Sequence, residues 1–301
     1  MQFTLAHLSD IHFGPLPPVK RRQLLSKRIT GYVNWQRNRG ASMGPATLAA
    51  LTDALEAIKP DHIAITGDLT NLGLPAEFET TAAWLAGLGP AEGISIVPGN
   101  HDAYVRHALQ KGLRQWAPWV TGDSGVAPKE NQDFPYQRVR DHVQIIGCSS
   151  AVATPVFVAA GRFGRRQAHD LAASLREGRE KGLFRIVLIH HPPVWGAASR
   201  AQRLYGITRF QSVIQKEGAE LILHGHTHLP QRHFINGPDG KVPVYGVPAA
   251  SQAPGGHKPA AAFNLFKISA EKNGAHSCHH EEWSITTIGG SAEITDENRL
   301  Y

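Results

Sequence analysis

Apolar runs that are typical of buried β-strands alternate with helical patterns along the chain. The strand-like runs lie at residues 3–9, 62–66, 94–97, 143–148, 184–189, 221–223, 242–247, 262–268 and 283–288. Helical patterns fall at about residues 45–58, 75–88, 165–181 and 211–217. The repeated order of strand, loop and helix predicts an α/β fold with short, buried strands.

Polar clusters rich in His, Asp and Asn come directly after five of these strand-like runs. They read Asp10-Ile11-His12, Gly67-Asp68, Gly99-Asn100-His101-Asp102, His190-His191 and His224-Gly225-His226-Thr227-His228. Ligand sites of α/β sheets gather at the carboxyl ends of the strands. We therefore expect the five clusters to meet in one site.

Such a set of side chains suits a pair of adjacent divalent cations. The pair needs several nitrogen and oxygen ligands, a bridging carboxylate, and open positions for water and substrate. Asp10 and His12 are one residue apart, so an extended backbone can direct both to the same side. Asp68 follows a glycine, where a tight turn leaves its carboxylate free to bridge. The clusters contain no cysteine, so two divalent or mixed-valence ions of manganese, iron or zinc all suit them.

The composition is that of a folded globular protein with anionic partners. Of the 301 residues, 42% are hydrophobic and 19% are charged, which argues against intrinsic disorder. The net charge of +6 favours phosphates, acidic membrane surfaces or nucleic acid. Because no run resembles a membrane span or a secretory signal, we expect a cytoplasmic protein. The cysteines, Cys148 and Cys278, lack a metal-binding or redox spacing and are expected to be reduced.

In this order, the clusters resemble the signatures of the calcineurin-like metallophosphoesterases. Those signatures are D-x-H, G-D, G-N-H-D/E, a single His and G-H-x-H, and all five occur between residues 5 and 228. The ordered combination is far more specific than any one motif. The compact Gly-Asn-His-Asp cluster and the short spacing between motifs look like the branch that contains the class III cyclic nucleotide phosphodiesterases.

The resemblance implies a fold and a role for each motif residue. The fold is a four-layer αββα sandwich of two mixed sheets flanked by helices. One metal ion is held by Asp10, His12, Asp68 and His228, and the other by Asp68, Asn100, His190 and His226. His101 is implied as the catalytic residue that contacts the phosphate or protonates the leaving oxygen, and Asp102 as the residue that orients its imidazole.

Two histidines next to the motif residues have less defined roles. His224 forms a second H-x-H pair with His226, which overlaps the pair formed by His226 and His228. The later pair preserves the family order G-H-x-H, so His224 is expected to support the ligands or to contact the substrate. His191, beside His190, is likewise expected to be a supporting residue.

Residues 16–40 form a basic insertion between the first motif and the next helix. Seven Lys and Arg residues alternate there with apolar residues such as Leu25, Ile29 and Val33, and the spacing predicts an amphipathic helix. One interpretation is a cap whose apolar side packs on the main domain. The others are a surface that binds an anionic substrate, or a contact with an anionic membrane surface through residues 20–39 at the inner membrane face.

The sequence predicts one metallophosphoesterase domain over residues 1–301. It includes the insertion at about 16–40 and a C-terminal β-rich extension at about 240–301. The histidines at positions 276, 279 and 280 lie beside two glutamates and are expected to form a solvated polar stretch. The oligomeric state stays open, with a homodimer among the alternatives.

The predicted activity is that of a dinuclear metal-dependent phosphodiesterase. It would hydrolyse a small phosphodiester, such as a cyclic nucleotide, by attack of a metal-activated hydroxide. The insertion is similar to segments of some UDP-2,3-diacylglucosamine pyrophosphohydrolases of lipid A synthesis, which gives a second hypothesis. A nuclease of the same superfamily is a third, but no aromatic-rich nucleic-acid module is present, so a nucleic-acid partner is not expected. A scaffold without catalysis is disfavoured because every ligand position is filled.

Overall fold

The computed structural model describes residues 2–39, 43–271 and 274–301. Its first sheet is mixed and runs in the order β14-β13-β12-β1-β2-β3. These strands are β1 (Gln2–Leu8), β2 (His62–Ile65), β3 (Ile94–Ile96), β12 (Ala262–Ala270), β13 (His276–Ile285) and β14 (Ala292–Arg299). The strands β1, β2 and β3 are parallel, whereas β12 pairs with β1 in the antiparallel direction.

The second sheet is also mixed and runs in the order β10-β11-β9-β7-β5-β4. It contains β4 (Tyr136–Arg140), β5 (Val143–Gly147), β7 (Phe184–Leu188), β9 (Leu221–His224), β10 (Arg232–Asn236) and β11 (Lys241–Gly246). The four inner strands are parallel, and the two edge strands are antiparallel to their neighbours. A separate short pair joins β6 (Gly161–Arg162) to β8 (Leu204–Tyr205).

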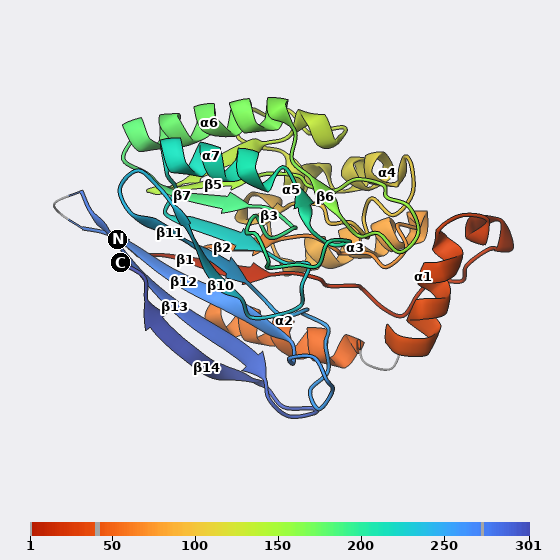
Figure 1. Cartoon of the computed structure of the whole chain (residues 1–301). Helices are drawn as coiled ribbons and strands as arrows, with labels where there is room; N and C mark the ends of the chain where they lie inside the picture. The colour runs from red at the N-terminus through yellow and green to blue at the C-terminus, as the bar shows by residue number, and fades with distance from the viewer. Residues whose placement is uncertain (1, 40–42, 272–273) are drawn as a thin grey trace.

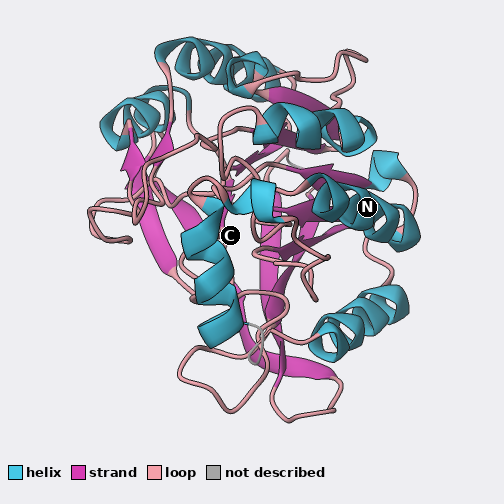
Figure 2. Ribbon diagram, turned by 90° about the vertical axis from the view of Figure 1, so that its right-hand side faces the viewer, coloured by secondary structure: helices cyan, strands magenta, loops and turns pink. Residues whose placement is uncertain are grey.

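Helices cover the outer faces of both sheets (Figures 1 and 2). On the first sheet, α2 (Pro45–Ile58) lies against β13 and β14, and α3 (Pro75–Leu88) follows β2. On the second sheet, α6 (Arg165–Glu180) lies against β5 and β7, and α7 (Ile207–Glu217) against β10. Two shorter helices, α4 (Ala108–Gln115) and α5 (Ala117–Val120), follow β3. The predicted four-layer αββα sandwich is confirmed.

The main core lies between the two sheets. Leu5 and Ile63 of the first sheet belong to the same buried cluster as Ile145, Leu188 and Leu221 of the second. Because successive side chains of a strand point to opposite faces, a strand between two layers must be apolar on both sides. This explains why β2, β5, β7 and β9 read as mainly apolar runs without alternation, in which polar residues such as Gln144 and Arg185 are exceptions.

Some elements differ from the sequence-based expectation. The helix predicted at 211–217 begins earlier, at Ile207, and the last predicted strand ends at Ile285. The histidine-rich stretch was expected to be solvated, and that prediction is wrong for His280. Its side chain is fully buried on β13, where its Nε2 donates a hydrogen bond to Asn264 Oδ1 at 2.8 Å. The pKa of His280 is lowered to about 4, mainly because the imidazole is buried.

The basic insertion folds into short helical segments rather than one amphipathic helix. They are η1 (Arg21–Leu24), α1 (Arg28–Asn34) and η2 (Trp35–Arg39), and residue 40 lies outside the described residues. Tyr32 packs toward the cluster formed by Leu72, Leu74 and Tyr104. Leu25, Ile29 and Val33, by contrast, are 86%, 52% and 41% exposed. The apolar side therefore packs on the main domain only in part.

Candidate metal centre

The five polar clusters meet at the edge where the carboxyl ends of β1, β2, β3, β7 and β9 lie together. The loops after β1 and β2 are joined by backbone hydrogen bonds from Asp10 N to Gly67 O and from His12 N to Asp68 O, both at 2.9 Å. The backbone N–H of His226, after β9, donates to Asp10 Oδ2 at 2.8 Å. The site is therefore built across both sheets.

One group of side chains converges around Asp10, His12 and His228. The Nε2 atom of His228 lies 3.1 Å from Asp10 Oδ1 and 3.3 Å from the Nε2 atom of His12. All three side chains are buried. Imidazole nitrogens and a carboxylate oxygen that face one another in this way offer ligand atoms to a common cation.

A second group converges around His190. Its Nε2 atom lies 3.1 Å from Asn100 Oδ1 and 3.4 Å from Asp68 Oδ2. His226 joins His190 in a further buried group of candidate ligand atoms. The same Asp68 oxygen lies 3.9 Å from Nε2 of His12. Asp68 thus stands between the two groups, in the position of a bridging ligand.

Carbonyl groups hold two of the imidazoles in a ligating orientation. The Nδ1 atom of His190 lies 2.6 Å from the carbonyl oxygen of Thr66, and Nδ1 of His12 lies 3.2 Å from that of Thr70. Because a carbonyl can only accept, each Nδ1 carries a hydrogen, which leaves Nε2 as the nitrogen that a cation can bind. Both Nε2 atoms point toward Asp68.

The charge states of the buried groups suit cations. Burial lowers the pKa of His226 to about 3, so its imidazole is neutral, and its buried Nε2 makes no hydrogen bond to a described residue. Burial raises the pKa of Asp10, but the adjacent His228 outweighs this effect and keeps the pKa well below its usual value. For His190, burial lowers the pKa and the Asp68 charge raises it above its usual value. A metal ion that binds His190 would therefore displace a proton from its imidazole. The nitrogen and oxygen donors of the site fit two ions of manganese, iron or zinc.

The motif backbone is strained at the proposed ligands. Positive φ angles occur at Asp10 (53°), His12 (42°), Asp68 (53°), His226 (72°) and His228 (58°). Residues other than glycine rarely adopt this region, and such outliers concentrate at functional sites. Gly225 is required for a different reason, because a Cβ atom there would lie 1.7 Å from Ser9 Oγ and 2.6 Å from Asp10 Oδ2.

The predicted catalytic pair needs one correction. The Nδ1 atom of His101 lies 2.6 Å from the carbonyl oxygen of Asn71. The Asp102 carboxylate instead accepts hydrogen bonds from the backbone N–H groups of Gly99, at 2.8 Å, and Thr70, at 3.0 Å. Asp102 therefore fastens the β3 loop to the β2 loop, and the imidazole is oriented by Asn71.

Of the two histidines that were expected to support the ligands, His191 belongs to the candidate group of His190 and His226, whereas His224 lies outside the groups of the described residues. Both ring nitrogens of His191 have partners, with Nδ1 at 2.7 Å from Ser150 Oγ and Nε2 at 3.0 Å from the Ala159 carbonyl oxygen. His224 directs Nδ1 to the carbonyl oxygen of Gly225 at 3.0 Å, and its ring packs against Gly246. Among the described residues, the candidate ligand groups include His226 and His228 but not His224.

Several residues near the centre carried no signal that sequence reasoning could use. Asn71 acts through its backbone carbonyl, which no motif encodes. Tyr104 packs its ring against that of His101, with centroids 5.4 Å apart. Lys258 lies 3.3 Å from Nδ1 of His228, although it is distant from every motif in the sequence.

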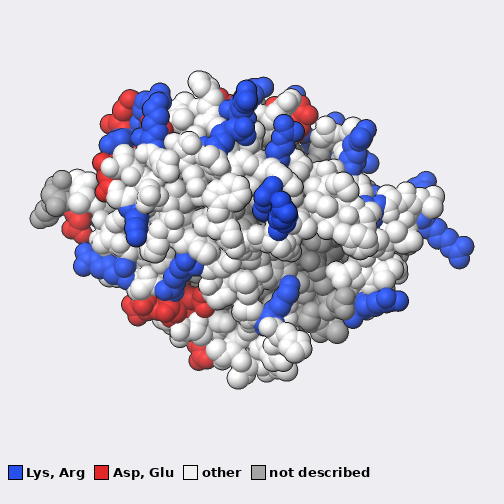
Figure 3. Space-filling model, viewed as in Figure 1, with Lys and Arg blue, Asp and Glu red and all other residues white. Residues whose placement is uncertain are grey.

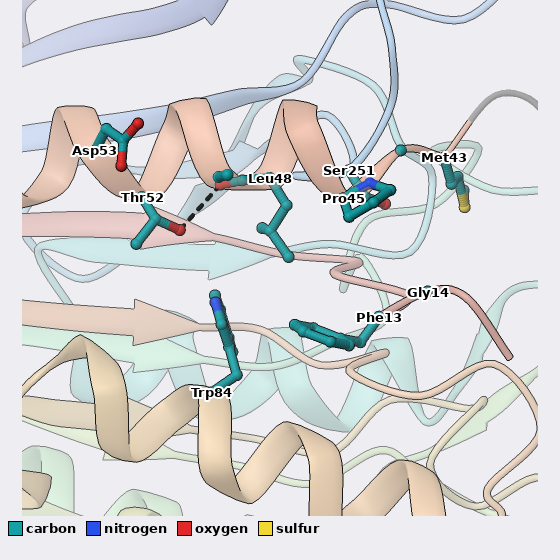
Figure 4. Close-up of a pocket in the computed structure, with 11 residues that line it drawn as sticks. Phe13, Gly14, Met43, Pro45, Leu48, Thr52, Asp53, Trp84 and Ser251 are labelled. Carbon is teal, nitrogen blue, oxygen red and sulfur yellow. Dashed lines mark hydrogen bonds between the residues drawn. The ribbon is translucent and has the colours of Figure 1, made fainter. Parts of the chain in front are cut away.

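A separate apolar cavity lies between α2 and α3 (Figure 4). It has a volume of about 240 Å³, and Phe13, Leu48 and Trp84 point into it. The hydroxyl of Thr52 is turned to the Leu48 carbonyl within α2. None of the proposed metal ligands is among the described residues that line this cavity, so it is distinct from the site at the strand ends.

A family model described as calcineurin-like phosphoesterase matches residues 3–230. The match covers most of the chain, and the chain belongs to this family. The predicted resemblance is therefore confirmed, and so, at the level of the family, is the predicted class of metal-dependent phosphoric ester hydrolase.

Curated relatives have names that agree with this class. A putative metallophosphoesterase of Caenorhabditis elegans is 32% identical over 236 residues, which are 77% of this chain and 44% of that protein. The glycerophosphodiester phosphodiesterase GpdQ of Enterobacter lignolyticus is 25% identical over 74% of this chain and 70% of its own length. A probable cyclic nucleotide phosphodiesterase of Synechococcus is 28% identical over 67% of this chain and 70% of its own. This chain thus spans less than half of the first relative.

Solved structures support the fold. A dimetal phosphatase from Danio rerio aligns with a TM-score of 0.64 at 14% identity, over 97% of this chain and 98% of that chain. The purple acid phosphatase PPD1 of yellow lupin aligns with a TM-score of 0.58 at 11% identity, over 99% of this chain and 53% of that chain. Within the described residues, none of the helices has the length and apolarity needed to span a bilayer.

Proposed function

We propose that this chain is a phosphodiesterase with a dinuclear metal centre that hydrolyses a small phosphodiester. The observation that carries the proposal is the position of Asp68, whose Oδ2 lies 3.4 Å from a nitrogen of one ligand group and 3.9 Å from a nitrogen of the other. A buried carboxylate between two sets of nitrogen and oxygen donors is the arrangement that two adjacent cations require.

Each motif residue has a role in this proposal. One ion is held by Asp10, His12, Asp68 and His228, and the other by Asp68, Asn100, His190 and His226. When bound, such a pair of ions polarises phosphoryl oxygens and lowers the pKa of water. His101 borders the ligands, and its Nε2, opposite the nitrogen held by Asn71, can contact the phosphate or give a proton to the leaving oxygen.

The relatives narrow the class of substrate. Two of them are named as phosphodiesterases, one for glycerophosphodiesters and one for cyclic nucleotides. Both substrates are small diesters, and we propose the same class here. We also propose a single catalytic domain, because β12 of the C-terminal extension pairs with β1, which carries the first motif.

The test is hydrolysis of bis(p-nitrophenyl) phosphate by metal-reconstituted protein. We expect turnover that depends on added Mn²⁺ and is abolished by a chelator. A panel of a cyclic nucleotide, a glycerophosphodiester and a phosphomonoester at equal concentration then ranks the substrates by kcat/KM. Absence of turnover on every diester by protein that contains two metal ions would refute the proposal.

The insertion favours a second candidate, in which the substrate is presented at a membrane. Leu25, Ile29 and Val33 project into solvent beside the exposed Lys20 and Arg21, and Figure 3 shows cationic side chains at the α1 end of the molecule. Exposed apolar and basic residues together favour contact with an anionic lipid surface. A UDP-2,3-diacylglucosamine pyrophosphohydrolase would need such a contact.

Vesicle co-sedimentation separates the two candidates. Protein in which Leu25, Ile29 and Val33 are replaced by Ser is compared with the wild type on vesicles with and without anionic lipid. The membrane hypothesis predicts binding that requires anionic lipid and is lost in the variant. Equal sedimentation of both proteins, together with activity on soluble diesters alone, would leave the first candidate.

A further inference from the structure

A pocket of about 380 Å³ opens on the proposed metal centre. Asn100, His101 and Tyr104 form one wall. The other lining residues come from the insertion, among them Lys27 and Gly31, and from two loops of the second half of the chain, among them Val158 and Gln202. The insertion is thus part of the pocket in which a substrate would lie.

Lys27 is a cation in the wall of this pocket. Its Nζ donates hydrogen bonds to Thr154 Oγ1 at 2.8 Å and to the Val158 carbonyl oxygen at 3.0 Å. It also lies 4.9 Å from the centre of the Tyr104 ring. An ammonium group has three N–H donors, so these two acceptors account for two of them. The position of the charge is fixed by groups that are all neutral.

The charge of Lys27 reaches the proposed metal centre. Burial lowers the pKa of Lys27, and the negative charge of Asp68 raises it in opposition. Lys27 lines the same pocket as Asn100, a proposed ligand, and the adjacent His101. Two divalent ions with the carboxylates of Asp10 and Asp68 would carry a net positive charge, and the ammonium of Lys27 would add to it in this pocket.

The neighbouring Arg28 has a different role. Its guanidinium donates to the carbonyl oxygens of Leu72 and Gly73, at 2.9 and 2.6 Å, and so anchors α1 on the loop after β2. The anchor leaves Lys27 facing the pocket from the same short segment. Arg28 thus attaches the insertion to the main domain, whereas Lys27 lines the pocket.

We propose that Lys27 is a substrate-binding residue whose ammonium binds an anionic oxygen of the substrate in this pocket. The inference rests on the proposed function, since it places the substrate at the metal centre. It assigns the insertion a part in the active site. The competing explanation is that Lys27 only clamps α1 to the loop that carries Thr154 and Val158.

The experiment uses inorganic phosphate as the probe and Mn²⁺-loaded protein. The dissociation constant of phosphate is measured by titration calorimetry for the wild type, Lys27→Gln, Lys27→Arg and Thr154→Val. Loss of one charge-assisted hydrogen bond is expected to weaken phosphate binding about 10- to 100-fold in Lys27→Gln. Lys27→Arg, which keeps the charge, is expected to retain most of the affinity.

Thr154→Val is the matched control, because it removes the hydroxyl acceptor of the clamp and leaves the ammonium in place. We expect near-wild-type phosphate binding. The inference is overturned if Lys27→Gln binds phosphate as the wild type does, or if Thr154→Val loses as much affinity as Lys27→Gln. Metal content and thermal unfolding of each variant show that the fold and the ions are retained.

Kinetics show which anionic oxygen is bound. If Lys27→Gln raises KM for both bis(p-nitrophenyl) phosphate and p-nitrophenyl phosphate, the ammonium contacts the scissile phosphate itself. A rise for the dianionic monoester alone indicates a second anionic oxygen. A wild type that binds phosphate through Lys27 but hydrolyses no diester would refute the proposed function and leave this inference intact.

Discussion

Replacement of Asp68 by Asn is the most direct test of the proposed centre. Asn has the same shape, and its Oδ1 can still accept the backbone N–H of His101, which lies 2.7 Å from the aspartate oxygen. The side-chain amide nitrogen would then face His190 and His12, where the ligand oxygen stands in the wild type. The substitution therefore removes one charge and one shared ligand atom with little change in volume.

The expected effect follows from the charge that is lost. Two unit charges at about 4 Å interact by about 4 kcal/mol at an effective dielectric constant of about 20. A metal ligand lies closer than about 4 Å to its ion, and each ion carries two charges. The energy of about 4 kcal/mol is therefore a lower estimate. Since about 1.4 kcal/mol corresponds to a factor of ten, we expect turnover to fall by at least about 10³-fold. Metal content should fall as well, because one carboxylate serves both ions.

Two measurements check this expectation. Elemental analysis counts the ions that remain after dialysis, and hydrolysis of bis(p-nitrophenyl) phosphate gives kcat and KM. Asp123→Asn is the control, because it makes the same chemical change at a carboxylate on the surface, where Asp123 pairs with Arg140 at 2.9 Å. Two bound ions and wild-type turnover in Asp68→Asn would show that Asp68 is not a bridging ligand.

Three further substitutions test other parts of the site and the core. His101→Ala should lower turnover by about 10²- to 10⁴-fold with both ions retained, and a loss of ions in elemental analysis would make His101 a ligand instead. Asp102→Asn offers one acceptor where the carboxylate holds the N–H groups of Gly99 and Thr70, so urea titration should give a free energy of unfolding about 2 kcal/mol lower. His280 has its pKa lowered to about 4 from 6.5, so its protonation favours the unfolded chain. In metal-free protein, the stability advantage of the wild type over His280→Gln should therefore shrink by about 2–3 kcal/mol between pH 6.5 and 4, and a constant difference over that range would contradict the buried neutral imidazole.

The elements that sequence reasoning placed well have strong local signals. The helices Pro45–Ile58 and Pro75–Leu88 each begin with proline at the first helical position and were predicted with the same bounds. The strands at the core are mainly apolar because both of their faces are buried. In these segments, local preference and tertiary burial favour the same structure, so the pattern is sufficient.

The edge strands β14 and β10 were missed because most of their residues are exposed to solvent. β14 reads Ala-Glu-Ile-Thr-Asp-Glu-Asn-Arg and β10 reads Arg-His-Phe-Ile-Asn, and both contain few buried apolar residues. The buried position of His280 depends on Asn264 and Asn298, which are supplied by the adjacent strands. No local pattern contains that information.

Some parts of the site could be predicted from the sequence, and others depend on the tertiary structure. Motifs name the ligand side chains, because metal chemistry restricts their types. The ligands His190 and His12 are oriented by the backbone carbonyls of Thr66 and Thr70, and His101 is oriented by that of Asn71. Any residue has a carbonyl, so no motif encodes these contacts. Lys27 was visible only as one of several basic residues, and its place in the pocket depends on how α1 docks.

Backbone geometry indicates that the centre is formed by the protein rather than by the ions. Strained φ angles cost on the order of 1–3 kcal/mol each and persist only where surrounding structure fixes them. Here the loops after β1 and β2 continue the parallel pairing of their strands through the hydrogen bonds of Asp10, His12 and Phe13 to the opposite loop. The Asp102 carboxylate holds the third loop against the second. Because these bonds do not involve the ligand atoms, the metal-free protein should keep its ligands in place. Binding of the ions should then cost little conformational entropy, since few side chains remain to be ordered.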